Sequence, residues 1–170
     1  DVAEELSIGG PNTITTLVID AGAVFESSTG RIGINGDAGH GIVNIQQPGS
    51  WWRIGGRLEA TDGYLNVADN SLLTTGQASL GASAGQMHAT VNNAAWDADG
   101  NLDVGPPTSS GLGRGTLTIQ NTGEMTVRGD VVVRGADLVS ELIVESDGHL
   151  DVSGAVNLPF WAVPAWVSCS

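Results

Sequence analysis

A short apolar–polar–apolar triplet recurs along this chain, and its regular spacing limits the possible folds more than any other feature. The clearest copy is Leu117-Thr118-Ile119. Matching copies are Leu17-Val18-Ile19, Val43-Asn44-Ile45, Leu65-Asn66-Val67, Ala89-Thr90-Val91 and Leu142-Ile143-Val144. Between their last residues the spacings are 26, 22, 24, 28 and 25 residues. Self-similarity at a period of about 20–50 residues is the signature of a repeat protein.

Each unit continues with two more triplets, separated by Gly, Asn, Asp and Ser residues typical of turns. The second triplets are Met125-Thr126-Val127, Leu150-Asp151-Val152, Trp52-Arg53-Ile54 and Trp96-Asp97-Ala98, with Phe25 and Leu73 at the same offset. The third triplets are Ile32-Gly33-Ile34, Leu58-Glu59-Ala60, Ala78-Ser79-Leu80, Leu102-Asp103-Val104, Val131-Val132-Val133 and Val156-Asn157-Leu158. The opening "ELSIGG" aligns with these third strands.

Three short strands every ~25 residues fit stacked coils better than a β-sandwich, in which turn signals recur every ~8–12 residues. Period-two alternation points the outer members of each triplet to one face. We therefore predict an all-β, right-handed parallel β-solenoid (β-helix) of triangular section with about six turns, or rungs. It occupies residues 1–158, with a partial first rung at 1–16, and residues 159–170 form an apolar tail. The buried residues should include Leu117, Ile119, Met125, Val127, Val131 and Val133, while Thr118, Thr126 and Val132 should face outward.

The phrase "GTLTIQNTGEMTVRGDVVVRG" at 115–135 resembles the Gly-rich repeats of the type V secretion and PEP-CTERM-associated kind, which occur in bacterial surface and secreted proteins. The resemblance extends over residues 5 to 158 and is clearest from 115 to 156. It implies a right-handed β-helix, export from the cell, and an adhesive or structural role without catalytic residues. The tail lacks the Pro-Glu-Pro signal of the sorting domain. The Asp at the first position suits a processed, mature protein.

The charge balance argues against two classes of partner. The chain has 19 acidic residues and six arginines, no lysine, and a formal net charge of −13. Nucleic acid and anionic lipid surfaces both require basic patches. No stretch approaches the ~20 apolar residues that span a bilayer. A single cysteine, Cys169, excludes an internal disulfide framework and a cysteine-based zinc site.

One string resembles a metal site. In "DADGNLD", Asp97, Asp99 and Asp103 resemble the start of a calcium loop. However, Gly comes fourth instead of sixth, and Thr108 occupies the twelfth position, where a bidentate Glu is expected. The repeat alignment also explains the string as a corner, so we expect no cofactor, with calcium as the alternative.

The positions of the carboxylates and tryptophans bear on two other functions of β-solenoids, catalysis and ligand binding. An enzyme would need paired carboxylates, and outward Glu59 and Asp103 lie two rungs apart. We therefore predict no catalytic residues. Of the adjacent Trp51 and Trp52, one must point outward, either to stack on a sugar ring or a partner protein or to cover the corner beside Pro48.

The ends of the solenoid suggest self-association. Neither end carries a polar cap, and the uncharged tail is a second apolar contact surface. The candidate subunit contacts are Leu6, Ile8, Phe160, Trp161, Val163, Trp166 and Val167. The tail is either a lid over the last rung or an intersubunit segment. We predict an extracellular or cell-surface structural protein that stacks head to tail into a fibre or surface layer. The alternatives are a monomeric adhesin or carbohydrate-binding module that contacts cell-surface polysaccharide, and then a polysaccharide-degrading enzyme.

Overall fold

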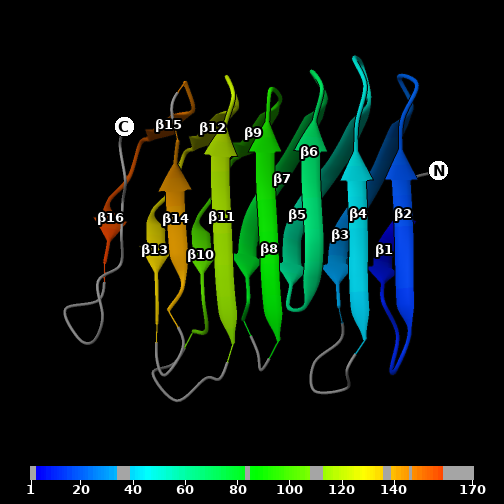
Figure 1. The fold of residues 1–170 in the computed structure, drawn as a ribbon, viewed down its shortest axis with the longest axis horizontal. Coiled ribbons are helices and arrows are strands. Elements are labelled where there is room, and N and C mark those ends of the chain that lie inside the picture. Colours follow the sequence, from blue (N-terminus) through cyan, green and yellow to red (C-terminus); the bar gives the residue numbers. More distant parts are fainter. Residues whose placement is uncertain are drawn as a thin grey trace.

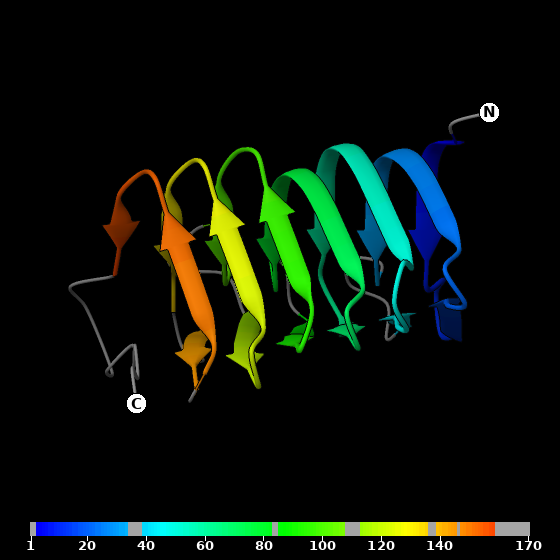
Figure 2. The same ribbon diagram turned by 90° about the horizontal axis from the view of Figure 1, so that it is seen from above.

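A computed structural model describes residues 3–33, 39–82, 85–107, 113–135, 139–145 and 147–158. Within these ranges the chain forms sixteen β-strands and no helix. Every pairing between strands is parallel, and the strands wind into a β-solenoid with three faces (Figures 1 and 2). In Figure 1 the nearer strands rise and the farther strands descend as the chain advances from its N-terminal end, so the coil is right-handed. The predicted fold class is confirmed.

Each rung contributes one strand to each face. The first face is a six-stranded sheet of β2 (Ile14–Ile19), β4 (His40–Ile45), β6 (Gly63–Ala68), β8 (Gln86–Asn92), β11 (Arg114–Gln120) and β14 (Glu141–Val144). The second face in later rungs holds β9 (Ala95–Ala98), β12 (Glu124–Val127) and β15 (His149–Val152). The third face holds β1 (Ala3–Ile8), β10 (Leu102–Val104), β13 (Val131–Val133) and β16 (Val156–Asn157).

In the first three rungs the second and third strands merge. There β3 (Val24–Ile32), β5 (Trp51–Ala60) and β7 (Leu72–Leu80) each continue around the second corner as one bent strand. The sequence predicts a break there, because glycine usually interrupts strands. Here glycine is needed for close packing: a Cβ added to Gly76 would lie 2.6 Å from the carbonyl oxygen of Gly56 in the rung below. The absence of a side chain lets the backbone of one rung approach that of the next and keep its pairing at the bend.

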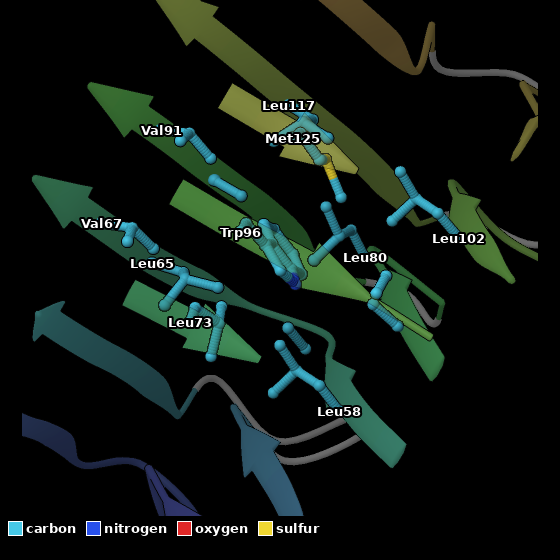
Figure 3. Close-up of a cluster of buried hydrophobic side chains, with 14 of the residues drawn as sticks. Leu58, Leu65, Val67, Leu73, Leu80, Val91, Trp96, Leu102, Leu117 and Met125 are labelled. Carbon is cyan, nitrogen blue, oxygen red and sulfur yellow. The ribbon is translucent and has the colours of Figure 1, made fainter. Parts of the chain in front are cut away.

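The register matches the triplet alignment. Leu117 lies opposite Ala89 on one side and Leu142 on the other, and Met125 lies opposite Trp96 and Leu150. All six residues predicted to be buried are buried, whereas Thr118, Thr126 and Val132 alternate with them as half-exposed residues on the outer surface. Figure 3 shows side chains from all three faces meeting in the interior. Stacking of the rungs thus places equivalent apolar residues above one another in columns along the solenoid axis.

One interior column contains the two largest buried side chains. It runs through the second face as Phe25, Trp52, Leu73, Trp96, Met125 and Leu150. The indole N–H of Trp52 donates to Ser27 Oγ, and that of Trp96 donates to Thr75 Oγ1, each at 3.2 Å. Both hydroxyls are buried and belong to the preceding rung. Each polar group is therefore satisfied only by stacking.

The first corner, between the first and second faces, uses left-handed backbone. Asn93, Asn121 and Asp147 have φ values of 47°, 49° and 62°. Asn and Asp tolerate this region better than other residues with side chains. The corners also stack, since Asn121 Nδ2 donates to Asn92 Oδ1 at 3.0 Å. On the first face, Asn44 and Asn66 form a side-chain ladder, with a 2.8 Å hydrogen bond from Asn66 Nδ2 to Asn44 Oδ1.

Candidate functional site

The acidic surface is arranged as ion pairs between neighbouring rungs. Arg114 lies 2.9 Å from Glu141, and Arg53 lies 3.5 Å from Glu26. His40 Nδ1 lies 3.1 Å from Asp62 on the following rung. Exposed pairs of this kind typically contribute about 0–1 kcal/mol each. These contacts favour the rung register, and none of them by itself forms a reactive centre.

The carboxylates of the calcium-like string do not converge. Asp97 lies on β9 of the second face, whereas Asp103 lies on β10 of the third face. Asp99 is paired with Arg128, and Asp103 with Arg134. In the part of the chain that the structure describes, no three His, Cys, Asp or Glu residues are grouped to hold a metal ion. Thr108 lies outside the described residues. The described geometry thus offers no residues that could hold a cation here.

Glu59 and Asp103, the two carboxylates considered for acid–base catalysis, are not neighbours on the third face. Glu59 and Asp103 lie in one column, with Ser79 of the intervening rung between them. Arg31 lies 3.8 Å from Glu59. Of the histidines, His88 stacks on Tyr64 with ring centroids 5.5 Å apart. These side chains are engaged with each other and form no nucleophile–base arrangement in the described regions.

The adjacent tryptophans have different environments. Trp52 is fully buried, so its inclusion as a ligand-stacking residue is wrong: strand alternation directs it into the core. Trp51 is half-buried on the outer surface, and its indole nitrogen donates to Thr74 Oγ1 at 3.2 Å. The Arg53 guanidinium carbon lies 5.6 Å from the Trp51 ring centroid, within range of a cation–π interaction. Only Trp51 remains a candidate for an external contact.

A cleft lies at the second corner, close to these residues. It has a volume of about 310 Å³ and is lined by Glu26, Ser27, Ser28, Arg53 and Gly55. A smaller hollow of about 90 Å³ on the third-face side of the same corner is lined by Glu5, Thr29, Gly30, Arg31, Arg57 and Glu59. The sequence did not predict either hollow. The available signal was the pair Gly55-Gly56 between the second and third triplets.

The two ends of the described solenoid expose strand edges. β2 and β14 are the outer strands of the first-face sheet, and β1 and β16 are the ends of the other sheet's main path. Val156 and Leu158 are 49% and 41% exposed. Of the predicted contact residues, Ile8 is buried and Leu6 is half-buried, both at the interior of the first rung. The predicted contacts within 159–170 lie outside the described residues.

Comparison with known proteins gives no further assignment. No protein-family model, curated protein or solved structure matches this chain. No described segment forms a helix with the length and apolar character needed to cross a bilayer.

Proposed function

We propose that this β-solenoid is a non-enzymatic structural module that associates end to end with further copies of itself. The observation that supports the proposal is the exposure of the apolar residues Val156 and Leu158 where the third-face columns reach the last described rung. Unpaired edges are ready templates for a strand of another molecule. Head-to-tail contacts do not close on themselves and build filaments.

The third face is the best match for such a joint. Its columns set Leu6 opposite Gly30 at one end and Val131 opposite Val156 at the other. Continued across the joint, they set Val156 and Leu158 opposite Leu6 and Ile8 of the next copy. All four positions are apolar and inward-facing. The third face can therefore extend without placing charge in the core.

The second face continues less favourably into the next copy than the third face does. Its outward column runs from Glu26 through Arg53, Thr74, Asp97 and Thr126 to Asp151. With β16 placed on β1, one strand level of the second face stays empty between Asp151 and Glu26 of the next copy, because β1 is the only described strand of its rung. The proposed joint therefore uses β16 and β1. We assign residues 159–170, with Phe160, Trp161, Val163, Trp166 and Val167, the role of an intersubunit segment in place of a lid.

The proposed location is outside the cell or at its surface. The supporting observation is the resemblance of residues 5–158 to the Gly-rich repeats of the type V secretion and PEP-CTERM-associated kind. The β-solenoid arrangement suits that assignment. A passive structural role also agrees with the separation of Glu59 and Asp103, which lie two rungs apart. Purified protein should accordingly cleave neither acidic nor neutral polysaccharides, and measurable turnover would favour the enzyme alternative.

The test of stacking compares two adjacent substitutions at the same edge. Leu158→Asp places a charge at an inward, exposed end position, whereas Asn157→Asp places the same charge on the outward side. Negative-stain microscopy of the full chain should show filaments for the parent and for Asn157→Asp and none for Leu158→Asp, with circular dichroism unchanged. A parent protein that stays monomeric at every concentration would overturn the proposal in favour of the adhesin alternative. Equal filament formation by both variants would show that the joint does not use this column.

A further inference from the structure

At the second corner, the second rung is one residue longer than the rungs on either side of it. Strand β5 advances by four residues from Ile54 to Leu58, whereas the paired part of β3 advances by three residues from Ser27 to Gly30. On the other side of β5, strand β7 also advances by three residues, from Thr75 to Ala78. β5 is therefore longer at this corner than both of its neighbours. Bulges of this kind bend a strand, re-aim its side chains and occur frequently beside functional sites.

The cleft beside this bulge has the size of a small-ligand site, and its surface is mostly apolar with a few polar groups. Its volume of about 310 Å³ lies at the lower end of the range for ligand pockets. Glu26, Ser28 and Arg53 supply polar groups at its walls, while Gly55 leaves one side open. A carboxylate accepts hydrogen bonds, a guanidinium donates them, and a hydroxyl does both. This mixture suits a ligand with many hydroxyl groups.

The same corner also holds a large share of the basic residues of an otherwise acidic protein, balanced in formal charge by Glu5, Glu26 and Glu59. Three of the six arginines line the cleft and the adjoining hollow, namely Arg31, Arg53 and Arg57. Their ion pairs are long: Arg53 lies 3.5 Å from Glu26, and Arg31 lies 3.7 Å from Glu5. Arg57 has no carboxylate within 4.0 Å among the described residues. The guanidinium of Arg57 is therefore available to an added anion.

We propose that this corner binds an acidic saccharide, a sugar that carries a carboxylate. The planar guanidinium fork of Arg57 matches a carboxylate in geometry. Glu26, Ser28 and Arg53 contact the ring hydroxyls. A nucleic acid does not fit, because the net charge of −13 repels an extended polyanion while one sugar acid needs only a local cation. This site does not depend on end-to-end stacking.

The experiment is an NMR titration of ¹⁵N-labelled full-length protein with a galacturonic acid trisaccharide and with its neutral counterpart, a galactose trisaccharide. The acidic trisaccharide should shift the amide signals of Ser28, Gly55 and Gly56 at millimolar concentration. The neutral trisaccharide should bind at least about fivefold more weakly, since a charge-assisted hydrogen bond contributes roughly 1 kcal/mol or more beyond a neutral contact. Equal binding of the two sugars, or no shift at this corner, would overturn the proposal.

Two variants and a matched control locate the site. Arg57→Gln should weaken binding of the acidic sugar about fivefold to tenfold and leave the neutral sugar unchanged. Arg128→Gln makes the same change at the same corner three rungs away and should have no effect. Gly55→Val should block the cleft in a folded protein, because a Cβ at Gly55 has its nearest contact at 4.0 Å. Undiminished binding in the Arg57→Gln and Gly55→Val variants would place any saccharide site elsewhere.

Discussion

The buried pairing of Trp96 with Thr75 gives a sharp test of the stacked core. Trp96 is 0% exposed, Thr75 is 2% exposed, and the indole nitrogen donates to Thr75 Oγ1 at 3.2 Å. The substitution Thr75→Val keeps the shape of the side chain and removes the acceptor. The indole N–H would remain buried without a partner, at a cost of about 1–3 kcal/mol. The new methyl group offsets up to about 0.8 kcal/mol of this cost.

The neighbouring residue provides the control. Thr74 Oγ1 accepts from the Trp51 indole nitrogen at the same 3.2 Å, but Trp51 is half-buried on the outer surface. Water can replace Thr74 there, so Thr74→Val should change stability by less than about 0.5 kcal/mol. The two variants thus differ in the burial of the bond that they remove.

The assay is equilibrium urea unfolding followed by circular dichroism. We expect Thr75→Val to lower the free energy of unfolding by about 1–2 kcal/mol, which corresponds to a fall in Tm of about 2–8 °C for a chain of this size. Thr75→Ser restores the acceptor and should recover part of the loss. Equal effects of Thr74→Val and Thr75→Val would refute the argument, because they would show that the Trp96–Thr75 bond is not buried in the folded protein.

Three further predictions concern the core, the corners and the tail. Ile119→Asp puts a charge into a fully buried column and should lower the free energy of unfolding by several kcal/mol. Thr118→Asp lies on the half-exposed outer side and should leave the thermal unfolding transition nearly unchanged. Equal destabilisation by the two variants would show that the register is wrong. Gly76→Ala should destabilise the protein by about 1–3 kcal/mol, because the new Cβ would lie 2.6 Å from the Gly56 carbonyl oxygen. Gly55→Ala should be tolerated, because the nearest atom to its Cβ is 4.0 Å away. Comparable Tm values for the two variants would contradict the close stacking at this corner. Deletion of residues 159–170 should abolish filaments in electron micrographs and leave folded subunits, and a truncated protein that forms filaments of unchanged spacing would exclude the tail from the joint.

The alignment of the rungs was predictable because stacked parallel strands place equivalent residues opposite one another. Phe25, Trp52, Leu73 and Trp96 fall in one column despite differing offsets in the sequence. The corners absorb the differences in length, so alternation within each triplet was enough to assign the inward side. The merging of strands in β3, β5 and β7 was not predictable, because the glycine signal is the same for a break and for a tightly stacked bend.

The candidate sites were less predictable than the fold. Asp97, Asp99 and Asp103 are close in the sequence, but the solenoid separates Asp97 and Asp103 onto different faces and pairs Asp99 with Arg128, 29 residues away. The pleat of the strand required adjacent Trp51 and Trp52 to point in opposite directions, and burial in the structure showed that Trp51 is the outward one. Proximity along the chain is a poor guide to a site in a fold whose contacts are made between rungs.

By itself, the sequence determined that this chain is a β-solenoid and which side chains line its interior, because both follow from a local alternation repeated at a steady interval. Only the tertiary structure decided which polar groups meet. Ser27 accepts from Trp52, and Arg53 reaches Glu26, because neighbouring rungs bring residues 25 and 27 positions apart into contact. The second-corner cleft likewise depends on the length of one corner relative to the corners on either side. The sequence of one repeat does not specify the lengths of the repeats beside it, so the second-corner cleft forms only once the rungs are stacked.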